Sequence, residues 1–290
     1  MDEIFMSLDI AIVSDIHHGP DRGSKKGSSA IPLLESFIAF TKETNPDCII
    51  DLGDRISDTD YETDLRLLGE IASTLRKLPG TPHYLLGNHD VAKLSVADNE
   101  AALQCSLASA SEDRNGFHLV FWNPFSKLDL AKGFSLQEGD LAWLKADLAA
   151  TSLPSVIFTH VPLDNGSMKG NFYFEKNFPH HAAYPEAQGE AIRDIIERSG
   201  KVVLCINGHA HWNAHHCIDG IHYVTIPSLT ELFTTWPEPN AAYARMSLSD
   251  HIEIEVFGRD PVFYRLPIKA PGTHWLNTSK DYAPGNLFPA

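Results

Sequence analysis

Hydrophobic positions in this chain fall into short apolar runs that alternate with longer segments in which apolar residues recur every three or four positions. Short runs bounded by turn residues predict buried strands, and the longer periodic segments predict amphipathic helices. We expect strands at residues 8–14, 47–52, 82–86, 116–122, 155–158 and 202–206. We expect helices at residues 31–44, 61–78, 95–111, 136–148 and 186–198. This alternation predicts an α/β fold.

The pattern changes after Gly208 to short strands, expected at residues 214–218, 221–226, 241–248, 252–257 and 261–266. The pair Asp219-Gly220 predicts a two-residue hairpin turn. We interpret these strands as a second, largely antiparallel sheet. One domain is predicted over residues 1–268. Residues 269–290 are rich in Pro and Gly and predict an irregular tail that packs on the body or on a second subunit.

Side chains that bind metals follow five of the strand-like runs. These segments are Asp15-Ile16-His17, Gly53-Asp54, Gly87-Asn88-His89-Asp90, Thr159-His160 and Gly208-His209-Ala210-His211. Ligands of α/β proteins gather outside the carboxyl ends of strands. Gly-Asp alone is more often a turn, and a lone His is more often a core residue, so the order of all five carries the argument. The mixture of Asp, Asn and His suits two divalent ions of intermediate hardness.

The order of these five segments resembles the calcineurin-like metallophosphoesterases over residues 9 to 230. The resemblance implies a four-layer α/β/β/α sandwich of two mixed sheets and a dinuclear metal centre. One ion would be held by Asp15, His17, Asp54 and His211. The other would be held by Asp54, Asn88, His160 and His209, so Asp54 would bridge the two. His89 would stand beside the metals as a catalytic residue without binding them, and Asp90 would orient it.

The chemistry explains why these residue types are needed. Two ions about 3.5–4 Å apart clamp the attacking and leaving oxygens of a displacement at phosphorus. A metal-bound water loses its proton near neutral pH and becomes the hydroxide nucleophile. The leaving alkoxide needs a proton, and His89 can supply it because an imidazole titrates near working pH. The ions expected are Mn, Fe or Zn. No serine nucleophile is required, and no Gly-x-Ser-x-Gly segment is present.

The leading function is therefore hydrolysis of a phosphodiester. Within the family the chain looks most like the class III cyclic-nucleotide and glycerophosphodiester phosphodiesterases. Residues 201–232 are similar, more loosely, to the manganese-dependent ADP-ribose/CDP-alcohol diphosphatases. A phosphomonoester or a phospholipid headgroup substrate remains open. A remote alternative is a non-catalytic scaffold, but such relatives usually lose ligands that this chain retains.

Substrate selection must come from residues between the metal segments. His18, Arg55 and Trp212 each lie beside a predicted ligand, although a salt bridge to Asp58 or Asp60 is an equal alternative for Arg55. The long loop 162–185 is rich in aromatic residues and His, and it either contacts substrate or forms a hydrophobic cap or dimer contact. Its candidate substrate contacts are Phe172, His180 and His181. Residues 22–29 predict a mobile, solvated loop near the mouth of the site, with contact to a substrate phosphate as the alternative.

Composition limits the partners. The net charge of −15 and the pI near 5.3 argue against duplex nucleic acid, which normally requires a basic face. No apolar run approaches the length of a membrane span, and no secretory signal is expected. The spacing of the four cysteines matches no disulfide or zinc framework, which favours a cytoplasmic location. We expect a small phosphoester substrate and allow for a homo-oligomer.

Overall fold

The apolar runs of the sequence form the central strands of two sheets in the computed structural model, which describes residues 7–124, 127–176 and 178–268. In sheet order, the first sheet contains β12 (Val262–Pro267), β11 (His251–Phe257), β10 (Tyr243–Leu248), β1 (Leu8–Val13), β2 (Cys48–Asp51) and β3 (His83–Tyr84). The second contains β4 (Ala110–Arg114), β5 (Phe117–Phe121), β6 (Ser155–Phe158), β7 (Val202–Asn207), β9 (Ile221–Thr225) and β8 (Ala214–Ile218). Both sheets are mixed. In the first, β1, β2 and β3 are parallel to one another at one edge and the remaining pairs are antiparallel; in the second, the parallel strands β5, β6, β7 and β9 are flanked by antiparallel strands on both sides.

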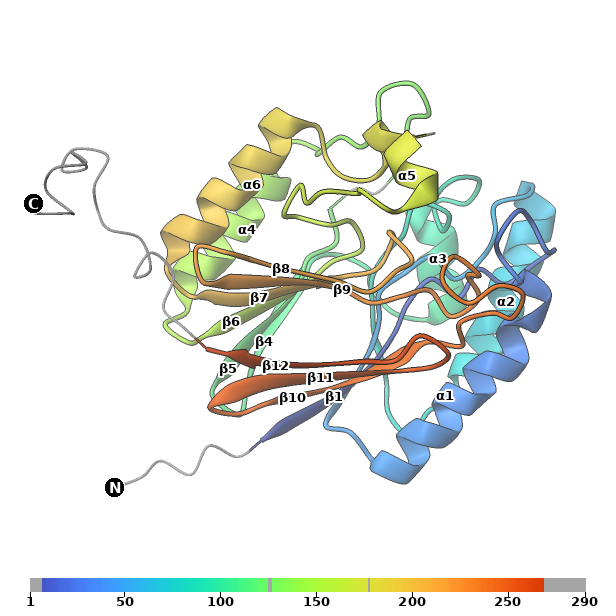
Figure 1. Ribbon diagram of the computed structural model, residues 1–290, viewed down its shortest axis with the longest axis horizontal. Helices are drawn as coiled ribbons and strands as arrows, with labels where there is room; N and C mark the ends of the chain where they lie inside the picture. Colours follow the sequence, from blue (N-terminus) through green and yellow to red (C-terminus); the bar gives the residue numbers. More distant parts are fainter. Residues whose placement is uncertain (1–6, 125–126, 177, 269–290) are drawn as a thin grey trace, which may run out of the picture.

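Helices cover the outer faces of both sheets (Figure 1). On the side of the first sheet lie α1 (Ala30–Thr44), α2 (Tyr61–Leu75) and α3 (Val96–Leu103), and on the side of the second lie α4 (Asp140–Ala150) and α6 (Glu186–Ser199). The short helix α5 (Phe172–Lys176) and the 3-10 turns η1 (Gly27–Ser29) and η2 (Pro179–His181) lie in connecting loops. The expected four-layer α/β/β/α sandwich is confirmed.

Strand β1 shows why the sequence adopts this arrangement. Leu8, Ile10 and Ile12 point into the core between the two sheets, whereas Ala11 and Val13 face the cluster that contains α1. Successive side chains of a strand point to opposite faces, so a strand covered on both sides must be apolar at every position. The uninterrupted apolar run of β1 therefore indicates a strand that is covered by a helix layer on one face and by a second sheet on the other.

The late strands do not form a sheet of their own, contrary to the expectation from sequence. Strands β8 and β9 extend the second sheet through the pairing of β9 with β7, and strands β10 to β12 extend the first through the pairing of β10 with β1. The Asp219-Gly220 hairpin is confirmed, because Ile218 lies opposite Ile221 across it. Pairing partners are chosen by long-range hydrogen bonding, which the local pattern does not encode.

The predicted helix at residues 95–111 is also shorter than expected. It ends at Leu103, and Gln104 follows with a left-handed φ of 58°. Residues 110–114 form β4 instead, which pairs with β5 across an Asn115-Gly116 turn. An Asn-Gly pair is a strong signal for a two-residue hairpin, so this strand was predictable.

Residues 269–290, predicted as an irregular tail, lie outside the described residues. Within the described part of the chain, no helix is both long and apolar enough to cross a membrane.

Candidate metal centre

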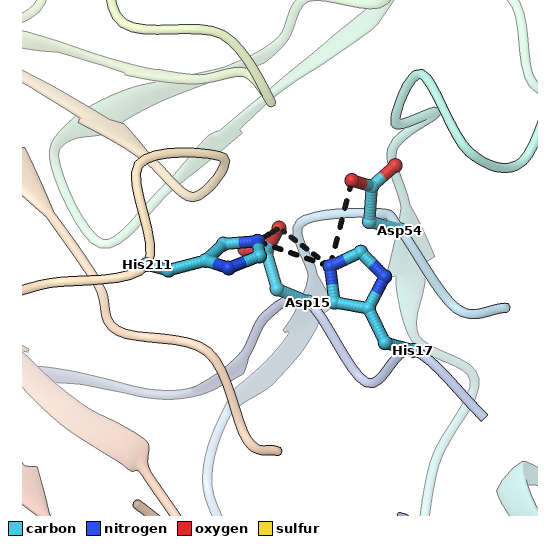
Figure 2. A group of neighbouring side chains, drawn as sticks. All are labelled: Asp15, His17, Asp54 and His211. Carbon is cyan, nitrogen blue, oxygen red and sulfur yellow. Dashed lines mark hydrogen bonds and ion pairs between the residues drawn. The ribbon is translucent and has the colours of Figure 1, made fainter. Parts of the chain in front are cut away.

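Three chain segments bring a first group of four metal-binding side chains together at the carboxyl ends of the strands. Figure 2 shows Asp15, His17, Asp54 and His211 pointing toward one another. The Nε2 atom of His211 lies 3.0 Å from Asp15 Oδ1 and 3.0 Å from His17 Nε2. Asp54 Oδ2 lies 3.8 Å from His17 Nε2. All four side chains are buried, and their ligand atoms lie within 4.8 Å of one another.

Asp54 also belongs to a second group, with His160 and His209, whose ligand atoms again lie within 4.8 Å of one another. Its Oδ2 atom lies 3.4 Å from His160 Nε2. The Oδ1 atom of Asn88 is buried and makes no hydrogen bond to the described residues. Asp54 therefore lies between the two groups, the place that the sequence predicted for a bridging ligand. From this geometry we propose that each of the two groups binds one metal ion, with the ligands predicted from the sequence.

Three of the four imidazoles are held by their outward ring nitrogen. His160 Nδ1 lies 2.9 Å from the Leu52 carbonyl, and His209 Nε2 lies 2.7 Å from the His181 carbonyl. His211 Nδ1 lies 2.8 Å from Glu231 Oε2. An acceptor on the outward nitrogen fixes both the ring orientation and the tautomer, and leaves the inward lone pair for a metal. This is the arrangement that metal-binding imidazoles adopt.

The charges of the cluster favour a cation. Burial would raise the pKa of the Asp15 and Asp54 carboxyls, but the neighbouring imidazoles hold both pKa values well below the usual range. Burial opposes protonation of His160, yet the Asp54 carboxylate raises its pKa to about 9. Burial lowers the pKa of His17 and of His209 to about 3, so both are neutral. Burial likewise opposes protonation of His211, but the Asp15 carboxylate raises its pKa to about 9, so His160 and His211 carry protons at neutral pH. A divalent ion would replace these two protons and would then have ionised carboxylates and neutral imidazoles as its ligands.

The backbone at the ligand residues has an uncommon conformation. Asp15, His17, Asp54, His209 and His211 all have φ between 46° and 63°. This left-handed region is unfavourable for residues other than Gly, and such strain concentrates at functional sites. The tight turns direct side chains from neighbouring strands to the same point.

Gly87 shows why the ligand motifs contain glycine. A Cβ atom at this position would lie 2.0 Å from Asp54 Oδ1 and 2.4 Å from the Asp54 amide nitrogen. Only a residue without a side chain lets the loop after β3 approach the Asp54 turn this closely. The glycine therefore permits Asn88 and Asp54 to reach one site.

His89 lies beside the metal-binding groups, but its partner is not the one expected. Its Nδ1 atom is 2.5 Å from Asp58 Oδ1, and its Nε2 atom is 3.9 Å from Asp54 Oδ2. Asp90 does not orient His89. Its buried carboxylate accepts hydrogen bonds from the amides of Asp54, Arg55 and Gly87. His89 and Asp90 are neighbours in a turn, yet His89 lines the pocket while Asp90 is fully buried against Arg55.

Arg55 is fully buried and is not among the residues that line the pocket beside the metal-binding groups, so it is not placed to bind substrate. Its guanidinium lies 2.8 Å from Asp51 Oδ2 and 3.0 Å from Asp90 Oδ2. The alternative salt bridges to Asp58 and Asp60 are also wrong. Arg55 therefore joins the end of β2 to the loop after β3, and it supports the two loops that carry Asp54 and Asn88.

A pocket of about 1000 Å³ opens beside the metal-binding groups. Asp54, Asn88, His89, His209 and His211 form its floor. The aromatic and apolar side chains of its walls are those of Leu128, Leu130, Tyr173, Phe174, Phe178, Leu232, Phe233 and Trp236. The loop predicted to select substrate thus supplies part of the wall, as does a segment after residue 231 that the sequence did not single out.

The structure places only one of the predicted substrate contacts with described side chains in the lining of the pocket. His181 lines the pocket. His18 instead pairs with Glu70, with 2.7 Å between Nε2 and Oε2, and His180 lies against the Leu130 carbonyl. Trp212 packs with Phe174 and Ala210 behind the wall. Of these four, only His181 is among the lining residues of the described chain. Phe172 begins α5, but its side chain is not described.

The structure adds two residues to the site. Glu231 is buried and holds His211, and its segment also binds the first ligand loop, since Ser228 Oγ donates to the Asp15 carbonyl. Lys25 lines the pocket with its Nζ 3.1 Å from His89 Nε2. The solvated loop predicted around residues 22–29 is therefore wrong for Lys25. Sequence offered one signal for it, the basic character of this stretch.

A separate group lies at the opposite end of the strands, where Cys48, His83 and Glu112 have ligand atoms within 4.8 Å of one another. Arg114 already pairs with Glu112, at 3.5 Å between Nη1 and Oε1. Burial raises the pKa of the Cys48 thiol to about 12, so this thiol is protonated. The group is distinct from the candidate metal centre.

A model of the calcineurin-like phosphoesterase family matches residues 8–213, which include every predicted metal ligand. This chain belongs to that family. The family uses a dinuclear divalent metal centre, and membership implies a metal-dependent phosphoester hydrolase. No curated protein sequence matches the chain.

Solved structures with the same fold are distant in sequence. A dimetal phosphatase from Danio rerio has a TM-score of 0.72 at 16% identity, over 90% of this chain and 99% of its own. GAP50, described as the anchor in the inner membrane complex of Plasmodium, has a TM-score of 0.58 at 12% identity, over 92% and 90% of the two chains. At these identities the similarity shows the fold alone.

Proposed function

We propose that this calcineurin-like protein hydrolyses phosphodiesters at a centre of two divalent ions. The observation that carries the proposal is the clustering of the predicted ligands beside a large, mainly apolar pocket, which is lined by four of them, Asp54, Asn88, His209 and His211. A phosphoryl group alone would fill little of about 1000 Å³. The substrate therefore carries an organic substituent that occupies the rest of the pocket.

The residues fit two divalent ions. His17 Nδ1, Asn88 Oδ1 and His160 Nε2 are buried polar atoms without a hydrogen-bond partner among the described residues, and buried polar groups are normally satisfied. Asn88 Oδ1 and His160 Nε2 belong to the proposed second ligand set. Mn, Fe and Zn all accept imidazole with carboxylate. Bound ions would supply Lewis acidity, polarising the phosphoryl group and lowering the pKa of a coordinated water.

The chain itself supplies the proton for the leaving group in this proposal. His89 lines the pocket next to Asp54, with its outward nitrogen held by Asp58. Burial would raise the pKa of Asp58, but the hydrogen bond from His89 lowers it, so Asp58 is a carboxylate and accepts the Nδ1 proton. When the ring is an imidazolium, its Nε2–H is directed into the pocket and gives its proton to the departing alkoxide, which leaves a neutral His89 with its Nδ1–H on Asp58.

A second candidate is a diphosphate ester of the ADP-ribose or CDP-alcohol type. Arg22, Lys25, Lys93 and Lys127 all line the pocket, although the chain carries a net charge of −15. Four cations gathered on an acidic protein support an anionic substrate, and they would suit a second phosphate. Phosphomonoesters remain a third candidate, since the metal groups would bind the phosphoryl group in the same way.

The first test compares turnover of bis(p-nitrophenyl) phosphate with that of p-nitrophenyl phosphate, on chelated enzyme reloaded separately with Mn, Zn, Fe and Co. We expect a higher kcat/KM for the diester with at least one metal. Faster hydrolysis of the monoester would make the protein a phosphatase. No turnover in protein shown to hold two ions would favour a narrow natural substrate or the scaffold alternative.

A second test concerns His89 and Asp58. We expect His89→Ala to lower kcat about 100-fold for diesters with a basic alkoxide leaving group, and less than about 10-fold for p-nitrophenolate, because a weakly basic leaving group needs no acid. Asp58→Asn should lower kcat for alkoxide leaving groups about 10-fold, as expected for a residue that orients another. Equal losses with good and poor leaving groups would show that His89 is not the acid.

The scaffold alternative keeps a specific test of its own. The described chain retains both carboxylates, the asparagine and all four histidines of the ligand set, together with His89. A scaffold needs none of these for chemistry. A metal-free preparation that bound a partner protein as well as the loaded one would support the scaffold.

A further inference from the structure

Two adjacent lysines, Lys25 and Lys26, have opposite surroundings. The Lys26 ammonium lies 3.0 Å from Asp21 Oδ2, and both of these side chains are about two-fifths exposed. Lys25 lines the pocket, with its Nζ 3.1 Å from His89 Nε2. Exposed ion pairs such as the first are common and contribute little. The loop therefore directs one lysine to the surface and the other into the candidate active site.

The loop that carries Lys25 is held by its backbone. Arg22 and Lys25 exchange two backbone hydrogen bonds of 3.0 Å, and the Lys26 amide donates to the Thr230 carbonyl at 2.9 Å. Leu232 donates in turn to the Ser24 carbonyl at 3.0 Å. Lys25 is thereby fixed to the segment that carries Glu231, the partner of His211. Its backbone is in place before any substrate arrives.

Gly27 lets this loop lie directly on the first ligand segment. A Cβ atom at Gly27 would be 2.6 Å from the His17 carbonyl oxygen and 2.7 Å from that of Gly19. Such contacts are forbidden, so glycine is required for the approach. The position of Lys25 is thus built into the same packing that places His17.

The Lys25 ammonium has unused hydrogen-bonding capacity. An ammonium carries three donors, and among the described residues one of them reaches an acceptor, the unprotonated Nε2 of His89. That contact must end when His89 Nε2 carries the proton for the leaving group, and the Lys25 ammonium is then free to bind the substrate. Burial lowers the pKa of Lys25, and Asp54, Glu231 and Asp58 oppose this shift, yet no carboxylate of the described residues forms an ion pair with it within 4.0 Å. A half-buried cation with free donors that lines a substrate pocket is suited to an anion.

We propose that Lys25 binds a non-bridging oxygen of the substrate's phosphoryl group, next to the leaving oxygen that His89 protonates. The inference rests on the proposed phosphoester hydrolysis and identifies the residue that recognises the phosphoryl anion at that site. A charge-assisted hydrogen bond from an ammonium to a phosphoryl oxygen is short and strong. Because the contact is made with substrate, transition state and phosphate product alike, it contributes mainly to binding.

The test compares Lys25→Met, Lys25→Arg and the matched neighbour Lys26→Met. The affinity of metal-loaded protein for inorganic phosphate is measured by calorimetry, together with kcat and KM for bis(p-nitrophenyl) phosphate and with metal content. We expect Lys25→Met to weaken phosphate binding and to raise KM by about 10- to 100-fold, with metal content unchanged. Lys26→Met should change either value less than about twofold, as for an exposed pair. Lys25→Arg should restore part of the loss, because it keeps the charge.

Phosphate affinity of Lys25→Met equal to that of the wild type would overturn the proposal. So would loss of bound metal in Lys25→Met, because Lys25 would then act by holding the site together. If the wild type binds phosphate but hydrolyses no ester, the proposed function fails, while the comparison of phosphate affinities still decides the role of Lys25.

Discussion

Asp54→Asn is expected to lower kcat/KM at least about 1,000-fold and to reduce the bound metal below two ions per chain. Asp54 lies within 3.4 Å of His160 Nε2 and within 3.8 Å of His17 Nε2, so it is the carboxylate shared by both ligand groups. An asparagine of the same shape offers one oxygen and no charge. A dinuclear centre stabilises the transition state by several kcal/mol. Each 1.36 kcal/mol of lost transition-state stabilisation lowers the rate about tenfold.

The measurement is metal content by elemental analysis alongside diester turnover. Asp250→Asn is the matched control, since its side chain is 81% exposed in the turn between β10 and β11, and it should retain full metal content and activity. Retention of two ions and of activity by Asp54→Asn would show that the bridging assignment is wrong.

The largest expected effect on stability comes from Asp90→Asn. The Asp90 carboxylate accepts hydrogen bonds from three backbone amides and from the Arg55 guanidinium, and it is fully buried. Removing one partner of a buried ion pair leaves the other charge poorly compensated. This commonly costs about 3–5 kcal/mol. We therefore expect the free energy of unfolding to fall by about that amount, measured by urea denaturation.

Two variants make this result specific. Asp98→Asn, at an exposed capping box of α3, should lower stability by about 1 kcal/mol at most. Asp58→Asn should alter the dependence on the leaving group with little change in stability, because the Asp58 side chain is more than a quarter exposed. A stability loss for Asp90→Asn no larger than that of Asp98→Asn would contradict the structural role assigned to the Arg55–Asp90 pair.

The clustering of the proposed metal ligands was predictable because its signals are local. Each ligand segment follows an apolar run, and the carboxyl ends of parallel strands meet at one edge of a sheet. The structure accordingly brings Asp15, Asp54, His160 and His211 to one point without any of them being adjacent in sequence. Gly87 is a local signal of the same kind, because a residue without a side chain is required where two loops approach each other closely.

The partner of His89 was not predictable from neighbours in sequence. Asp90 follows His89 directly, yet it points into the interior toward Arg55, and Asp58 from the preceding loop reaches the ring instead. Arg55 was misassigned for the same reason. Adjacency in sequence says that two residues are close, but the direction of a side chain is set by the backbone turn and by what packs beneath it.

The sequence by itself determined the α/β class, the positions of most strands and helices, and which side chains we propose as metal ligands, because periodicity and motif order are properties of short segments. The tertiary structure alone decided which sheet each late strand joins, which carboxylate holds which imidazole, and that Lys25 rather than Lys26 faces the pocket. Each of these depends on contacts between segments far apart in the chain. Such contacts are selected by the packing and hydrogen bonding of the whole fold, and no local pattern contains them.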